Sequence, residues 1–386
     1  MKKPLFVLVS LIMTAPSSYA LDLVTAYQLA QKNDPTWQAQ QLQYQVDQLN
    51  LGLAQGNLLP TISVNTSITR KNQATEPNQS LNIEGFDSNK LLASSSTQRQ
   101  ASVTARQPLF RWDAWQGLKQ VKTSISLSEV TLRLQQQQHI LTTAQSYFNV
   151  LRQQALTKAH VEEEKALLEQ LNMMQAKLRQ GLVARSEVRE ADAQYQNARA
   201  NRIAGQLQVL LAQEQLEQII GPYRENLAVL TTNFEYQKPQ PDDLQAWQEL
   251  AQSQNLYVQQ AHLQHQYAED AKRVEKAARL PQVEAVASYG YSQQSPKSLI
   301  ASDGQFDQVG VEVNWNAFTG GRTKINIEKA QLSIEKAMAE LDAARRKAQT
   351  DVRKAYMQLE SDQAKLQARL VAMQSAQHVA NASQAQ

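Results

Sequence analysis

The sequence of 386 residues contains no cysteine, few aromatic residues and no long apolar stretch beyond its first twenty residues. Without cysteine, the chain forms no disulfide bond and carries no lipid on a cysteine behind a cleaved leader. No later segment approaches the ~20 apolar residues of a transmembrane helix, so any membrane-spanning part must consist of strands. Aromatic residues are 6% of a chain that is 42% hydrophobic, which fits long water-facing helices better than one large globular core.

The sequence also lacks the usual signs of nucleic-acid binding and catalysis. A formal net charge of +3, spread evenly, does not predict a nucleic-acid partner. No phosphate-binding glycine loop and no Ser/His/Asp spacing stands out, so we predict no enzyme and no cofactor. His262 and His265 lie three residues apart and could bind a metal with Glu269. Two solvated helix histidines are the favoured interpretation, and we predict no metal site.

Residues 1–20 have the three parts of a secretory signal peptide. Lys2-Lys3 gives the positive start, Leu5 to Met13 the apolar run, and Ser18-Tyr19-Ala20 a small-x-small cleavage site. The apolar run is too short to span a bilayer. We therefore predict a mature chain that begins at Leu21, outside the cytoplasm.

The stretch from Gln308 to Gly321 predicts a membrane strand, because apolar and polar residues alternate strictly along it. A spanning strand needs about 9–11 residues, and a charged residue turned toward lipid costs about 2 kcal/mol. Glu312 therefore fixes which face is wet. The predicted lipid-facing residues are Val309, Val311, Val313 and Trp315, and the predicted lumen-facing residues are Glu312, Asn314 and Asn316.

Long helical patterns surround the strands. The run from Trp112 to about Arg179 would be about 100 Å long at 1.5 Å per residue, which no globular domain accommodates, so its spacing predicts a coiled coil. After an interruption at Gln180-Gly181-Leu182, a second helix is predicted from about Ser186 to Ile220. A first helix is predicted from Asp22 to about Leu58, with strands at 61–69 and 100–110.

The second half of the chain repeats the first. Leu29-Ala30-Gln31 matches Leu250-Ala251-Gln252 and Leu59-Pro60 matches Leu280-Pro281 at an offset of 221 residues, while Phe110 matches Phe318 at 208. We therefore expect a first repeat over residues 21–235, with a helix, two strands and a helical hairpin. The second repeat, over 236–386, has a helix, two strands and a long helix.

Four strands per chain cannot close a barrel, because the smallest membrane barrels have eight, and an open edge in lipid leaves backbone groups unsatisfied. The chain must therefore share a barrel with copies of itself, and composition does not decide between two and three. The predicted fold class is an α+β membrane protein. It combines two structural repeats, four membrane strands contributed to a shared β-barrel, and long coiled-coil helices that continue the barrel in water.

Three segments resemble the TolC-type outer-membrane efflux family over nearly the whole chain from Asp22. Gln107–Asp113 and Trp315–Arg322 are similar to the two strand-to-helix junctions of that family. Gly181–Val188, with Glu187 in place of the usual aspartate, is similar to its periplasmic helix-tip turn. The resemblance implies a homotrimer with a twelve-stranded barrel in outer-membrane lipid, a periplasmic α-barrel and an equatorial belt.

The resemblance also implies a function, that of a passive exit duct that docks to a periplasmic adaptor protein and an inner-membrane transporter. The expected adaptor-docking residues are Gly181, Leu182, Val183, Ala184, Ser186, Glu187 and Val188. Drug efflux and protein secretion remain open as the cargo. A trimeric surface adhesin or structural stalk is the alternative function, although an adhesin would carry its strands at one terminus and a passenger domain outside.

The repeat finally predicts that a helix is missing at the carboxyl end. At an offset of 208, the counterparts of Gly181 and Gly221 fall beyond Gln386. Roughly forty residues of α-barrel wall are therefore expected to be absent relative to the repeat, together with a second tip turn. The expectation at this point is a fragment or a truncated product.

Overall fold

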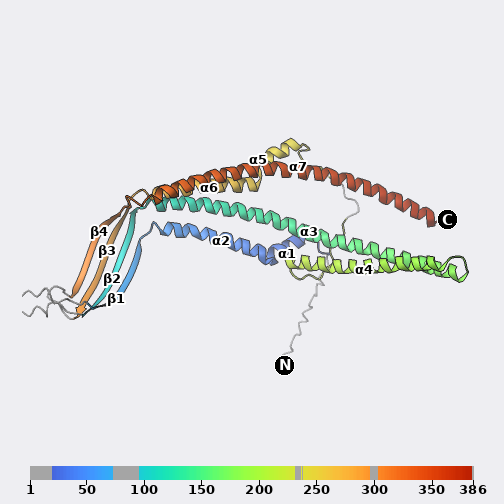
Figure 1. Ribbon diagram of the computed structural model, residues 1–386, viewed down its shortest axis with the longest axis horizontal. Helices are drawn as coiled ribbons and strands as arrows, with labels where there is room; N and C mark the ends of the chain where they lie inside the picture. Colours follow the sequence, from blue (N-terminus) through green and yellow to red (C-terminus); the bar gives the residue numbers. More distant parts are fainter. Residues whose placement is uncertain (1–19, 73–94, 231–235, 237, 296–302, 385–386) are drawn as a thin grey trace, which may run out of the picture. The chain divides into compact units, whose positions relative to one another are not determined.

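The computed structural model describes residues 20–72, 95–230, 236, 238–295 and 303–384 (Figure 1). The predicted signal peptide, apart from Ala20, therefore lies outside the described residues. The chain divides into two compact units that interleave in sequence, residues up to Leu42 with Leu132–Gln237, and Gln43–Thr131 with Lys238–Gln386. The predicted limits at 235 and 236 follow the repeat rather than compactness, and they remain a prediction.

The first predicted helix is in fact two helices, α1 (Leu23–Asn33) and α2 (Pro35–Gly56), so the single helix predicted to run to about Leu58 was wrong. Asp34 interrupts it in an extended conformation, because a residue before proline is driven out of the α region. The Asp34 carboxylate then accepts hydrogen bonds from the Thr36 N–H and hydroxyl at 2.8 and 2.7 Å, which caps the start of α2.

The same interruption recurs in the second half, between α5 (Leu244–Gln254) and α6 (Leu256–Ala277). Asn255 lies 221 residues after Asp34, is likewise extended, and its side chain accepts from the N–H groups of Tyr257 and Val258. All four boundaries of α1 and α2 reappear at this one offset in α5 and α6. The offset of 221 found in the sequence therefore also describes where these helices begin and end.

Four strands form one antiparallel sheet in the order β1-β2-β3-β4 (Figure 1). Their bounds are β1 Thr61–Asn72, β2 Ser95–Phe110, β3 Gln282–Ser295 and β4 Gly304–Asn314. β1 and β4 are the edges of this sheet within the chain. β1 and β2 are longer than the sequence patterns predicted, whereas β4 both begins and ends earlier than the predicted stretch from Gln308 to Gly321.

Pairing places the two residue classes of the strands on opposite faces. Val309, Val311 and Val313 pair with Ala287, Ala285 and Val283, and β1 adds Ile62, Val64 and Ile68 to the same face through partners such as Val103. Glu312 pairs with Glu284 on the other face, where serine, threonine and glutamine predominate. One register thus puts most apolar residues of the four strands on one face, although Val286 and Phe306 lie on the polar face and Arg99 and Asp307 on the apolar one.

β4 ends at Asn314, so Trp315 and Asn316 lie outside the strand in which they were predicted. The reason is the partner strand: β3 begins at Gln282, which pairs with Asn314, and the residue before it, Pro281, has no N–H for a further ladder bond. The Trp315 indole instead donates to the carbonyl of Arg279 at 3.0 Å. Trp315 and Asn316 therefore belong to the connection toward the next helix.

The long helices match their sequence patterns closely. α3 spans Trp112–Arg179, α4 spans Arg185–Ile220 and α7 spans Arg322–Gln384. In the first unit, α1, α3 and α4 bury a cluster that includes Tyr147, Val150, Leu216 and Ile220. In the second unit, α5, α6 and α7 bury a smaller cluster, Ala251, Val258, Ala261, Leu341 and Ala348. Among the described residues, no helix is both long and apolar enough to cross a membrane.

Candidate functional site

The turn between α3 and α4 is formed by residues 180–184 and joins two antiparallel helices (Figure 1). Gly181 has φ +76°, a conformation that side chains with a Cβ rarely adopt, although nothing lies within 4 Å of where a Cβ would be. The N–H groups of Gly181 and Leu182 donate to the carbonyls of Leu178 and Lys177, both at 2.9 Å, which closes the end of α3. Backbone conformation, rather than space, therefore requires glycine here.

Glu187 holds the start of α4. Its carboxylate accepts from the Ala184 N–H at 3.4 Å, half of a capping box, since an alanine side chain has no acceptor to return the contact. The longer side chain that replaces the usual aspartate thus bonds within the turn. Leu182 is 68% exposed at the end of the hairpin, an apolar side chain open to a partner. A docking role for residues 181–188 remains a prediction.

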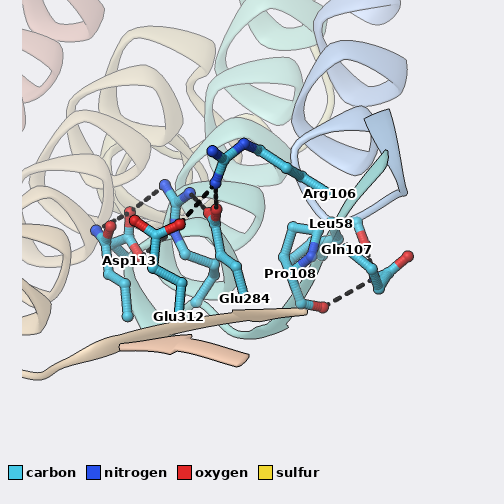
Figure 2. A network of polar contacts seen from close by, with 9 residues as sticks. Leu58, Arg106, Gln107, Pro108, Asp113, Glu284 and Glu312 are labelled. Atoms are coloured by element: carbon cyan, nitrogen blue, oxygen red, sulfur yellow. Dashed lines mark hydrogen bonds and ion pairs between the residues drawn. The ribbon is translucent and has the colours of Figure 1, made fainter. Parts of the chain in front are cut away.

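Five charged residues form a junction network where the sheet meets the helices (Figure 2). They are Arg106 at the end of β2, Arg111 and Asp113 at the start of α3, Glu284 on β3 and Glu312 on β4. Arg106 Nη1 lies 2.8 Å from Glu312 Oε2 and 3.8 Å from Glu284 Oε2, so one guanidinium links three strands. Glu284 Oε1 also accepts a hydrogen bond from Arg111 Nη1 at 3.2 Å.

Arg111 continues the junction network to the helix. It donates to Asp113 through Nη2 at 2.9 Å and through Nε at 3.1 Å, a two-bond pairing that fixes the guanidinium plane. Gln282 adds a bond to the same carboxylate at 3.3 Å. Because a chain of paired charges runs from β4 through β2 and β3 to α3, the network couples the sheet to the first turn of the long helix.

A neutral contact reinforces this junction on the other side of β2. The Gln107 amide donates to the carbonyls of Leu58 at 3.2 Å and Pro108 at 2.8 Å (Figure 2). Pro108 has no N–H to offer the ladder, and the register of β2 against β3 shifts between Pro108 and Phe110. Gln107 therefore ties this irregular strand end to the turn after α2.

Of the junction network, the sequence singled out only Glu312 as a site residue. Arg111 and Asp113 lie inside the junction motif Gln107–Asp113, but the motif does not reveal their partner Glu284. Arg106 and Glu312 are 206 residues apart and meet only through the strand register. A useful signal would have been that Arg106, Glu284 and Glu312 are charges on the polar parity of their strands.

We expect the junction network to weaken in acid. Hydrogen bonds from Arg111 lower the pKa of Asp113 below its ordinary value of 3.8. A lowered pKa contributes stability that is present above about pH 4 and is lost as the pH falls through the value in the folded protein. Emission of Trp112 and Trp115, which flank Asp113, should change below about pH 4 in the native chain and already at neutral pH in Asp113→Asn. A native acid transition unaltered by this substitution would contradict the assignment.

A second polar cluster, which the sequence analysis did not find, holds α3 against α6. Asp270 on α6 is 1% exposed and accepts from the Thr123 hydroxyl at 2.7 Å. Arg273 pairs with the same carboxylate, and Lys119 Nζ lies 3.7 Å away. A buried carboxylate is thus compensated by one hydroxyl and two cations from two helices.

Among the described residues, the histidines considered as metal ligands are not part of a cluster of side chains that could bind a metal ion. His262 is exposed and His265 half-buried on α6, while Glu269 pairs with Arg273 at 3.6 Å. No group of three or more His, Cys, Asp or Glu side chains suited to a metal ion occurs in the part of the chain that the structure describes.

Comparison with known proteins shows which protein family the sequence matches. The family model described as outer membrane efflux protein matches residues 26–222 and 247–386. Outer membrane protein TolC of Escherichia coli is 29% identical over 359 residues, which cover 90% of this chain and 70% of TolC. Alkaline protease secretion protein AprF of Pseudomonas aeruginosa is 26% identical over 372 residues, which cover 95% of this chain and 75% of AprF.

Solved structures show the same fold at low identity. The outer membrane protein VceC of Vibrio cholerae superimposes with a TM-score of 0.71 at 15% identity, covering 92% of this chain and 83% of VceC. The CmeC outer membrane channel of Campylobacter jejuni gives 0.72 at 17% identity, covering 89% of this chain and 72% of CmeC.

Proposed function

The chain belongs to the outer membrane efflux protein family, and from this premise we propose that it acts as a homotrimer, docked to a periplasmic adaptor and an inner-membrane transporter. It is an outer-membrane exit duct for efflux or type I secretion, with its helical part in the periplasm. The duct is passive, and we assign no catalytic role to any of its residues. The family is described as one of efflux proteins, while AprF and the proteases secretion protein PrtF of Dickeya chrysanthemi carry secretion in their names, so both kinds of cargo stay open for this chain.

One observation carries the proposal: the sheet has an apolar face and a polar face, and the apolar face is uncovered. Ile62, Val64 and Ile68 are 71–75% exposed, and Val309 is 85% exposed. Soluble proteins do not leave such a face to water, whereas a membrane strand turns it to lipid. We therefore assign Val309, Val311 and Val313 to lipid.

The opposite face is assigned to the lumen. Serine, threonine, asparagine and glutamine line it along β1 to β3, and Glu312 and Asn314 belong to the same face of β4. The junction network lies at the helix end of this face, so the assignment puts its charges at the passage from sheet to helices. Trp315 and Asn316 drop out of the two strand assignments because β4 ends before them.

A barrel shared between copies follows from the strand edges. Among the residues that the structure describes, β1 and β4 each have one side without a partner strand, and in lipid each unpaired backbone group costs several kcal/mol. Pairing β4 of one copy with β1 of the next removes all edges when the ring closes. Two copies would supply eight strands, the minimum, and three supply twelve; we propose three copies because the resemblance to the efflux family implies a homotrimer. Crosslinking between β1 and β4 of different copies tests this arrangement.

The cargo and the transport role are tested together in cells. Deletion of the gene should raise antibiotic susceptibility if the duct serves efflux, or abolish release of specific proteins if it serves secretion. Reintroducing the gene should restore the lost activity. A deletion strain unchanged in both measurements would contradict the proposed function.

The turn at residues 181–188 is proposed to bind the adaptor, and Gly181 supplies the test. Gly181→Val should distort the turn, since a β-branched residue does not tolerate φ +76°. We expect loss of transport and of crosslinking from Ser186 to the adaptor, with trimer yield unchanged.

Gly181→Asn is the matched control, because asparagine accepts the left-handed region far better than valine. Asparagine should retain most transport activity. Equal transport by the two variants would show that the shape of this turn does not matter for docking.

A further inference from the structure

Leu21 is packed like a core residue although the predicted cleavage site lies directly before it. Its side chain is 5% exposed and belongs to the cluster of Tyr147, Leu216 and Leu227. Ala20, the preceding residue, is exposed. The bond between Ala20 and Leu21 therefore separates exposed chain from packed structure.

The backbone of Leu21 is also fixed on both sides. Its N–H donates to the carbonyl of Asn226 at 2.8 Å, and its carbonyl accepts from the Ala228 N–H at 2.9 Å. These two bonds make a parallel bridge between Leu21 and Leu227. One residue thus forms a piece of sheet with the segment that follows α4, far away in sequence.

Tyr147 on α3 adds a side-chain hydrogen bond to these backbone bonds. Its hydroxyl donates to the Leu21 carbonyl at 2.9 Å, and the Ala228 carbonyl lies at 3.4 Å. Burial raises the pKa of the Tyr147 hydroxyl, so it keeps its proton at neutral pH. Asp22 follows and accepts from the Thr25 N–H at 2.7 Å, which starts α1 immediately.

We propose that the amino terminus left at Leu21, when the predicted leader is cleaved after Ala20, stays docked in a terminus site formed by Tyr147, Asn226, Leu227 and Ala228. In this step water adds its hydroxyl to the Ala20 carbonyl carbon and its hydrogen to the Leu21 nitrogen. The amide between them breaks. The leader leaves with a carboxylate, and Leu21 keeps an amine.

The terminus site needs no rearrangement for this step. The Leu21 nitrogen donates to Asn226 before cleavage, and an ammonium group at the same place is a stronger donor. The other hydrogens of the ammonium group point to the side where the exposed Ala20 was attached, and there they contact water. The docked terminus then holds residues 226–228 against α3 and α4.

The first test is the terminus of the protein isolated from outer membranes. Amino-terminal sequencing and intact mass should give Leu21 as the first residue. A chain that begins at any other residue would overturn the proposal, whatever the duct transports, because the measurement does not depend on transport.

The second test uses the rate of trypsin cleavage to measure whether residues 226–228 stay docked. Arg224 is exposed two residues before Asn226, so release of Leu227 should open the bond after Arg224 to cleavage. We expect Leu21→Ser to be cut there several-fold faster than the native chain, and Tyr147→Phe, which keeps the ring, to be cut faster as well.

Val24→Ser is the matched control, since Val24 is an aliphatic residue of α1 that is 64% exposed. It should be cut after Arg224 at the native rate. Equal rates for Leu21→Ser, Tyr147→Phe and Val24→Ser would show that Leu21 does not hold the segment. If Leu21→Ser yields no folded protein, the Tyr147→Phe rate decides alone.

Discussion

Replacing Val309 with arginine should remove most of the trimer from the outer membrane. Val309 is near the middle of β4, 85% exposed, on the apolar face and paired with Ala287. An arginine turned toward lipid at the bilayer midplane costs about 2–4 kcal/mol per copy, and each trimer would carry three. The measurement is the amount of trimer in outer-membrane fractions, read on gels without boiling.

The neighbouring position gives the control. Gln308 pairs with Ser288 on the polar face, so Gln308→Arg places the same side chain, one residue away, in the aqueous lumen. It should leave trimer yield close to that of the native chain. Equal losses from Gln308→Arg and Val309→Arg would mean that the face assigned to lipid is wrong.

The strand parity was predictable because alternation is a local property of the sequence. Val309, Val311 and Val313 could be grouped without knowing any partner strand. The end of β4 could not be read in the same way, because alternation continues through Trp315 and Asn316 although β3 offers no partner beyond Gln282. Strand ends depend on the neighbour, whereas strand faces depend on the strand alone.

The helices likewise have features that the local sequence predicted and features that it did not. α3 was predicted from Trp112 to Arg179 because no proline interrupts a regular apolar period. The break at Asp34 was missed although Pro35 follows it, since proline is also common in the first turn of a helix. Asn255 gives a weaker signal still. Only the offset of 221 residues, applied to Asp34, would have pointed to it.

Polar partners across elements were the least predictable part. The junction network depends on a register that joins Arg106 to Glu312 and on the approach of Arg111 to Glu284. None of these contacts has a sequence spacing that distinguishes it from solvated charges. Hydrophobic periodicity selects the faces that pack, and side-chain pairing is then settled by geometry within those contacts.

Asp270 offers the second large effect, because a carboxylate that is 1% exposed has no water to replace its partners. Asp270→Ala removes the acceptor of the Thr123 hydroxyl and the partner of Arg273. Loss of hydrogen bonds to a charged group costs about 1.5–3 kcal/mol. We expect hydrogen exchange of the α6 amides to accelerate accordingly, since opening α6 from α3 becomes easier by that amount.

Asp342→Ala is the control for the loss of charge alone. The Asp342 side chain on α7 is 48% exposed and pairs with Arg345 one turn away at 3.3 Å, an arrangement worth at most about 0.5 kcal/mol. Asp270→Asn separates the hydrogen bond from the ion pairs. Its side-chain amide oxygen still accepts from Thr123, while the attraction to Arg273 and Lys119 is lost. Its exchange rate should fall between those of the native chain and Asp270→Ala. Protection of α6 that is the same in Asp270→Ala and Asp342→Ala would mean that this carboxylate does not hold α6 to α3. The contact would then rest on apolar packing.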